Sequence, residues 1–108
     1  MNKDTSYNGW SNYATWRVNL EVFDSIPLSD FEGVIDKFTE DFDGNYIEHT
    51  LLLDAWQVAP MLAERAEYYV ELSSEQGLAR DYALAFLREV NYIEIAEHMI
   101  KDYISEAA

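Results

Sequence analysis

Apolar residues recur at steps of three and four along most of this 108-residue chain, and this spacing constrains the fold more than any other feature. Such steps place apolar side chains on one face of an α-helix. They run through the stretches 13–23, 31–42, 54–73, 78–90 and 91–105. The pattern predicts an all-α fold, a compact bundle of four or five amphipathic helices in a single domain, 1–108, with residues 1–10 as an N-terminal arm docking on it.

Polar residues that are typical helix caps precede several of these stretches. A side-chain oxygen at such a position accepts a hydrogen bond from a backbone amide of the first turn. Ser11 or Asn12 would start the first helix, Ser29 and Glu32 would form a capping box for the second, and Asn91 would cap the last.

Residues 46–53 are ambiguous, because they fit either a short strand or the approach to the next helix. A lone strand has nothing to pair with, so we expect an extended or helical connection there. The preceding Asp43-Gly44-Asn45 is typical of a turn. A calcium loop starting at Asp41 is disfavoured, since Tyr46 and Leu52 occupy the positions that require glycine and glutamate.

The second and last predicted helices carry the longest apolar faces, and we expect them to share one core. Its predicted members are Phe31, Ile35, Phe38, Ile95, Met99 and Ile100. The opening stretch adds a second stripe, in which Tyr13, Trp16, Leu20 and Phe23 would face inward.

The strongest global property is charge, with 21 acidic against 7 basic residues and a formal net charge of −14. This excess disfavours direct binding to nucleic acid or anionic lipid and favours a basic protein partner. The chain has neither a run of about 20 apolar residues nor the apolar core of a signal peptide. We therefore expect a cytoplasmic protein.

Two rows of acidic residues are candidate partner-binding sites. Glu64, Glu67 and Glu71 occupy successive turns of one predicted helix. Their carboxylates would lie about 5 to 6 Å apart, close to the spacing of phosphates along one nucleic-acid strand. The second row would run along the predicted helix 31–42 and consists of Asp30, Asp36, Glu40 and Asp41. Either row could also be an ordinary solvated face.

Residues that would indicate catalysis are few. The chain has no cysteine and two histidines, His49 and His98. Glu94 and His98 are four residues apart, which predicts a pair on a helix surface, and a zinc site would need a third ligand. No glycine-rich phosphate loop or nucleophile motif is present. We predict that the protein is not an enzyme and has no catalytic residues, cofactor or metal.

Three stretches resemble a group of short uncharacterised proteins carried by phages and mobile elements. They are 8–20 (Asn-Gly-Trp-Ser-Asn-Tyr-Ala-Thr-Trp-Arg-Val-Asn-Leu), 78–84 (Leu-Ala-Arg-Asp-Tyr-Ala-Leu) and 94–100 (Glu-Ile-Ala-Glu-His-Met-Ile). The resemblance implies a genetic context in which small accessory proteins often counter host defence. It transfers no activity or site residue.

Two hypotheses about function follow from charge and context, beside the third alternative of an enzyme with an unrecognised site. In the first, the protein binds and inhibits a basic, nucleic-acid-binding host defence protein, of the anti-CRISPR or anti-restriction type, with carboxylates in place of phosphates as a DNA mimic. In the second, it is a helical adaptor or regulatory module that binds its partner through an apolar and aromatic groove.

Overall fold

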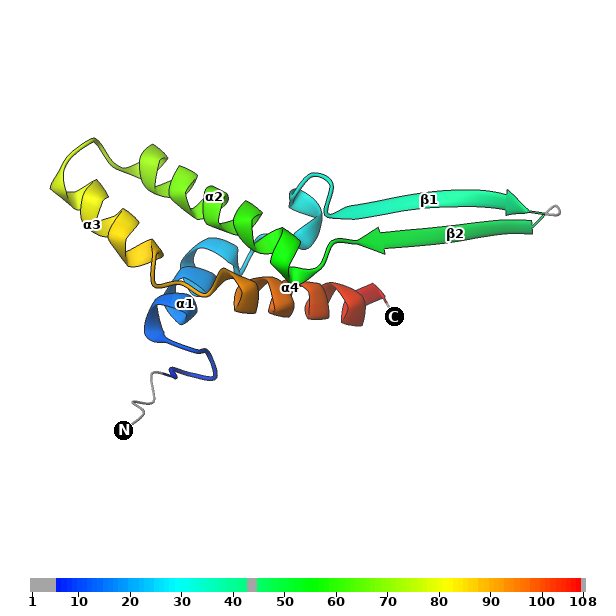
Figure 1. The fold of residues 1–108 in the computed structure, drawn as a ribbon, viewed down its shortest axis with the longest axis horizontal. Coiled ribbons are helices and arrows are strands. Elements are labelled where there is room, and N and C mark those ends of the chain that lie inside the picture. The colour runs from blue at the N-terminus through cyan, green and yellow to red at the C-terminus, as the bar shows by residue number, and fades with distance from the viewer. Residues whose placement is uncertain (1–5, 43–44, 108) are drawn as a thin grey trace.

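The computed structural model describes the backbone of residues 6–42 and 45–107, and the side chains of these residues except 36–51 and 107. The order of elements is α1 (Tyr13–Val18), the π-helix η1 (Asn19–Phe23), the 3₁₀-helix η2 (Leu28–Asp30), β1 (Ile35–Phe42), β2 (Asn45–Leu52), α2 (Ala55–Ser73), α3 (Leu78–Leu87) and α4 (Tyr92–Ala107). The helices form one packed body, and the two strands extend away from it (Figure 1).

The long helix α2 begins where the sequence predicts, after Asp54. The Asp54 carboxylate accepts a hydrogen bond from the backbone N–H of Gln57 at 2.9 Å, and the Gln57 side-chain oxygen accepts one from the backbone N–H of Asp54 at 3.0 Å. This reciprocal pair is a capping box. Pro60 lies inside α2 without ending it. The predicted helix 54–73 is confirmed.

The predicted helices 78–90 and 91–105 correspond to α3 and α4 and are also confirmed. Asn91 caps α4 as expected, because its side-chain oxygen accepts a hydrogen bond from the Glu94 backbone N–H at 3.1 Å. The Arg80 guanidinium of α3 donates to the backbone carbonyl oxygens of Glu71, at 2.8 Å, and Ser74. This side chain therefore satisfies carbonyls at the end of α2 and holds the turn between the two helices.

The hydrophobic core lies where α2 and α4 pack together and where α1, η1 and the segment 28–34 cover them. Its buried apolar residues are Ala14, Val18, Phe23, Leu28, Phe31, Val34, Val58, Leu62, Ala66, Leu87, Val90, Ile95 and Ala96. The helical bundle predicted from the apolar spacing is confirmed for this body of the molecule.

The six predicted core residues have different outcomes. Phe31 and Ile95 are buried, and Ile35, Met99 and Ile100 are partly buried and pack against the core. The side chain of Phe38 lies outside the described residues.

The prediction of a helix over 31–42 is wrong, because Ile35–Phe42 forms β1 and pairs antiparallel with β2. The register runs from Ile35 opposite Leu52 to Phe42 opposite Asn45. Apolar residues four positions apart, such as Phe38 and Phe42, fit both a helical period and an alternating strand period. The turn predicted at Asp43-Gly44-Asn45 falls mostly on residues 43–44, which lie outside the described residues. The strand β2, Asn45–Leu52, covers most of 46–53, so the expectation of an unpaired extended or helical connection there is wrong, because β1 supplies the partner.

The predicted capping box of Ser29 and Glu32 is absent as well. The 3₁₀-helix η2 follows Pro27 and has no side-chain cap. No helix begins at residue 31, so there is no first helical turn whose backbone N–H groups the Ser29 hydroxyl could cap.

The inward face of the opening helices differs from the predicted stripe. Ala14, Val18 and Phe23 are buried, whereas Tyr13 is 43% and Leu20 is 48% exposed. The backbone N–H of Asp24 bonds to the Asn19 carbonyl oxygen at 2.8 Å, five residues back. Because this π-helical turn is wider than an α-helical turn, Phe23, five residues after Val18, lies on the same buried face as Val18 and Ala14. Trp16 is only partly buried.

Candidate partner-binding surface

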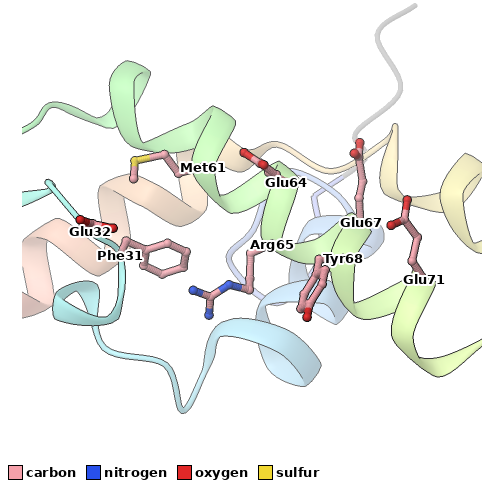
Figure 2. Close-up of a pocket in the computed structure, with 8 residues that line it drawn as sticks. All are labelled: Phe31, Glu32, Met61, Glu64, Arg65, Glu67, Tyr68 and Glu71. Carbon is pink, nitrogen blue, oxygen red and sulfur yellow. The ribbon is translucent and has the colours of Figure 1, made fainter.

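One side of α2 borders an open groove of about 650 Å³. Its lining residues are Phe31, Glu32, Met61, Glu64, Arg65, Glu67, Tyr68 and Glu71 (Figure 2). The whole first predicted row, Glu64, Glu67 and Glu71, therefore lies in one surface feature, which we call the α2 groove. All three side chains are exposed. The helix places them together because they are three and four residues apart.

The electrostatics of the α2 groove are strongly negative. Glu32 adds a fourth carboxylate from the segment after η2, against one guanidinium, that of Arg65. Arg65 lies over the ring of Phe31, 4.6 Å from its centroid, in a cation–π contact. Among the described residues, the ion pair of Arg17 and Glu21, at 2.6 Å, involves none of the groove carboxylates. The α2 groove therefore combines exposed negative charge with a partly aromatic floor.

Tyr92 of α4 lies close enough to Glu67 to be affected by its charge. Burial and, to a smaller extent, the negative charge of Glu67 together raise the pKa of the Tyr92 phenol from 10.0 to about 12. Both effects disfavour the phenolate. The buried Tyr92 hydroxyl finds no hydrogen-bond partner among the residues that the structure describes.

The second predicted row, Asp30, Asp36, Glu40 and Asp41, does not lie along one helix. Asp30 is exposed in η2, whereas Asp36, Glu40 and Asp41 lie on β1, where their side chains are outside the described residues. The helical alignment that suggested this row is absent, because the segment is a strand.

The opening motif, 8–20, has a structural role that centres on Thr15, a residue that the sequence did not single out. Thr15 is fully buried, and its hydroxyl donates to the Asn12 side-chain oxygen at 2.7 Å and accepts from the Asn91 backbone N–H at 2.8 Å. Asn12 also caps α1 and donates to the Glu89 carbonyl oxygen at 2.9 Å. These bonds attach α1 to the junction of α3 and α4.

Glu94 and His98 each have a different neighbour from the one expected. The Glu94 carboxylate accepts a hydrogen bond from the Ser11 backbone N–H at 3.0 Å. The His98 ring packs on Trp10, with ring centroids 4.2 Å apart. Both residues of α4 thus contact the N-terminal segment, and a Glu94–His98 pair is not needed to explain their positions.

Aromatic rings of the N-terminal segment form a second contact cluster. Tyr7, Tyr13 and Trp16 have ring centroids 4.9 to 5.7 Å apart. Rings at these distances touch one another directly and leave no space for a ligand between them. Asn8 and Gly9, with φ of 48° and 86°, form the tight turn that returns Trp10 to pair with Tyr7.

Metal ligation and membrane insertion have no candidate residues in the described ranges. No group of three or more His, Asp or Glu side chains there is arranged to hold a metal ion. None of the described helices is both long enough and apolar enough to cross a bilayer.

No protein-family model matches the chain, and no curated protein or solved structure is found to be similar to it.

Proposed function

We propose that this protein is a small acidic accessory protein of a phage or mobile element that binds and inhibits a basic, nucleic-acid-binding host protein in the cytoplasm. The observation that carries the proposal is the α2 groove, in which four carboxylates from α2 and residue 32 stand against one guanidinium. Lys and Arg side chains that normally bind phosphates would pair with these carboxylates. The net charge of −14 would add long-range attraction to such a partner.

Displacement from DNA tests this proposal, because a DNA mimic competes for the site that DNA occupies. Host lysate is loaded on DNA-cellulose, the column is washed with the purified protein, and the eluted host proteins are identified by mass spectrometry. We expect elution of specific DNA-binding proteins, and this elution should weaken as salt is added, since charge attraction is screened.

Two matched variants locate the effect on the α2 groove. Glu64→Gln, Glu67→Gln and Glu71→Gln together should abolish elution while preserving the fold, because they relieve repulsion between like charges on one helix. The control variant, Glu75→Gln, Glu89→Gln and Glu97→Gln, makes the same change in net charge at exposed positions outside the groove. Equal elution by both variants would contradict the role of the groove, and no elution by the unmodified protein would contradict DNA mimicry altogether.

A second candidate function is the helical adaptor, and a specific feature favours it. Leu72 at the end of α2 and Leu78 and Tyr82 of α3 are 66%, 65% and 68% exposed. Leu78 and Tyr82 are four residues apart and so share one face of α3. Binding through such side chains should persist at high salt, which distinguishes it from binding through the α2 groove.

A further inference from the structure

A second groove, of about 710 Å³, lies between α4 and the loop that follows η1. We call it the α4 groove. Its deepest apolar side chains are Phe23 and Leu28, which are 2% and 3% exposed. Met99 and Tyr103 of α4 line it as well and are partly buried. The floor is therefore apolar and belongs to the folded core, so it is largely formed before any partner binds.

The rim of the α4 groove is acidic. Asp24 lies on the loop side, and Asp102 and Glu106 lie on α4, and all three are exposed. No lysine or arginine is among the residues that line it. Trp10 contributes a wall on which the His98 ring packs, with centroids 4.2 Å apart. The α4 groove thus has an apolar floor that an apolar side chain can contact and a rim of carboxylates that would attract positive charge.

We propose that the α4 groove docks a basic amphipathic peptide segment of a partner protein. An apolar side chain of that segment would lie against Phe23, Met99 and Tyr103, and flanking Lys or Arg residues would reach the rim carboxylates. His98, Asp102 and Glu106 are spaced four residues apart along α4, so the rim is extended and suits a linear segment.

Charge excludes a second copy of this chain as the preferred occupant. Each copy carries a net charge of −14, and two acidic rims would repel each other. A basic segment gains attraction from the same field. This inference does not depend on the α2 groove, because the two grooves share no lining residue.

Peptide display tests the inference without knowledge of the natural partner. Random 16-residue peptides displayed on phage are selected on the full-length protein, and the affinity of enriched peptides is measured by fluorescence anisotropy. We expect enriched peptides to contain Lys or Arg on both sides of a large apolar residue. Replacing that apolar residue by serine should abolish binding, since charge alone does not fill the floor of the groove.

Variants of the protein then locate the binding site. The double variant Asp102→Lys with Glu106→Lys should lower the affinity for the selected peptides by about tenfold or more, because two rim charges that attract the basic peptides become repulsive. The control, Glu75→Lys with Glu89→Lys, makes the same change in net charge at exposed positions just before and just after α3, outside both grooves, and should weaken peptide binding much less. Circular dichroism confirms that both variants are folded.

Three results would overturn the inference. They are the absence of enriched peptides, enrichment of neutral or acidic peptides, and equal loss of affinity in the two variants. Because the DNA-cellulose experiment depends on Glu64, Glu67 and Glu71, and this one on Asp102 and Glu106, each proposal can fail while the other stands.

Discussion

Thr15 illustrates how much of this fold depends on a single hydroxyl group. It is the fully buried polar residue of α1, and it connects the cap of α1 to the backbone at the start of α4, 76 residues away. Leaving a partly buried amide without an acceptor costs stability, so this bond helps to hold the N-terminal helix against the start of the C-terminal helix, together with the bond from Asn12 to the Glu89 carbonyl oxygen. The opening motif therefore acts first as a structural connection.

Replacing Thr15 with valine should destabilise the protein by about 1 to 3 kcal/mol, because the Asn91 N–H loses its acceptor while the side-chain shape is kept. Urea unfolding measures this change. A double-mutant cycle with Asn12→Ala should show coupling of about 0.5 kcal/mol or more, since the two side chains are bonded directly. Additive effects would contradict the shared network.

Tyr92 is the opposite case, a buried hydroxyl for which the described residues offer no partner. Replacing Tyr92 with phenylalanine should leave the free energy of unfolding at neutral pH unchanged or raise it, because a desolvated and unpaired polar group is removed. A loss of more than about 1 kcal/mol in urea unfolding would indicate that the hydroxyl makes a stabilising bond.

The same residue predicts a pH dependence. The unfolded chain releases the phenol proton near the ordinary pKa of 10.0, and the folded protein releases it near 12. Between these values the unfolded state binds fewer protons, so stability falls as pH rises through this window. The stability of the wild type should therefore decrease more than that of Tyr92→Phe over the window. Parallel decreases in urea unfolding would show that the Tyr92 pKa is not raised.

At the scale of elements, the hairpin is the least integrated part of the molecule. The strands β1 and β2 pair with each other and extend beyond the helices (Figure 1). Its base is closed by a hydrogen bond from the Leu53 N–H to the Val34 carbonyl oxygen at 3.0 Å. Ile35 and Leu52, the first residue pair of the ladder, pack against the core. The base of the hairpin is therefore joined to the helical body.

Shortening the hairpin, with residues 37–50 replaced by Asn-Gly, should leave the helical body folded. The new turn preserves the closed base, because Asn-Gly adopts the tight turn of two-residue hairpins. Circular dichroism should keep its helical signal, and thermal unfolding should stay cooperative, with Tm changed by a few degrees. Loss of cooperative unfolding would mean that the outer part of the hairpin packs on the body.

At the scale of the whole molecule, the excess of acidic residues dominates. The formal net charge of −14 is beyond the magnitude of about 2 to 8 that solubility needs in a small domain. Self-repulsion of this size destabilises the folded state. An excess of acidic residues that weakens the fold is consistent with selection for binding a basic partner. Both proposed grooves would bind such a partner.

Added salt should therefore stabilise the protein. Raising NaCl from about 0.01 M to about 0.1 M shortens the screening length from about 30 Å to about 10 Å and weakens repulsion between distant carboxylates. Differential scanning calorimetry should show an increase in Tm. The triple variant of Glu64, Glu67 and Glu71 should start from a higher Tm and respond less to salt. A Tm that is independent of salt would contradict the role of self-repulsion.

The sequence by itself determined the helices whose ends carry local signals. The apolar spacing over 54–73 and 91–105, with Asn91 as the cap of the second stretch, specifies α2 and α4, because caps and periodic faces act within a few residues. The positions of Glu64, Glu67 and Glu71 on one side of α2 follow from the same periodicity. Net charge, and the expectation of a basic partner that it carries, required no structure at all.

Tertiary structure decided what local patterns left open. Phe38 and Phe42 fit a helix and a strand equally well, and only pairing with β2 selects the strand. The π turn at Asn19–Asp24 places Phe23 on the same face as Ala14 and Val18, whereas a period of three and four grouped Phe23 with Tyr13 and Leu20. The α4 groove joins Trp10, Asp24 and Asp102, which are far apart in sequence. Such a surface exists only once non-local packing has brought its parts together.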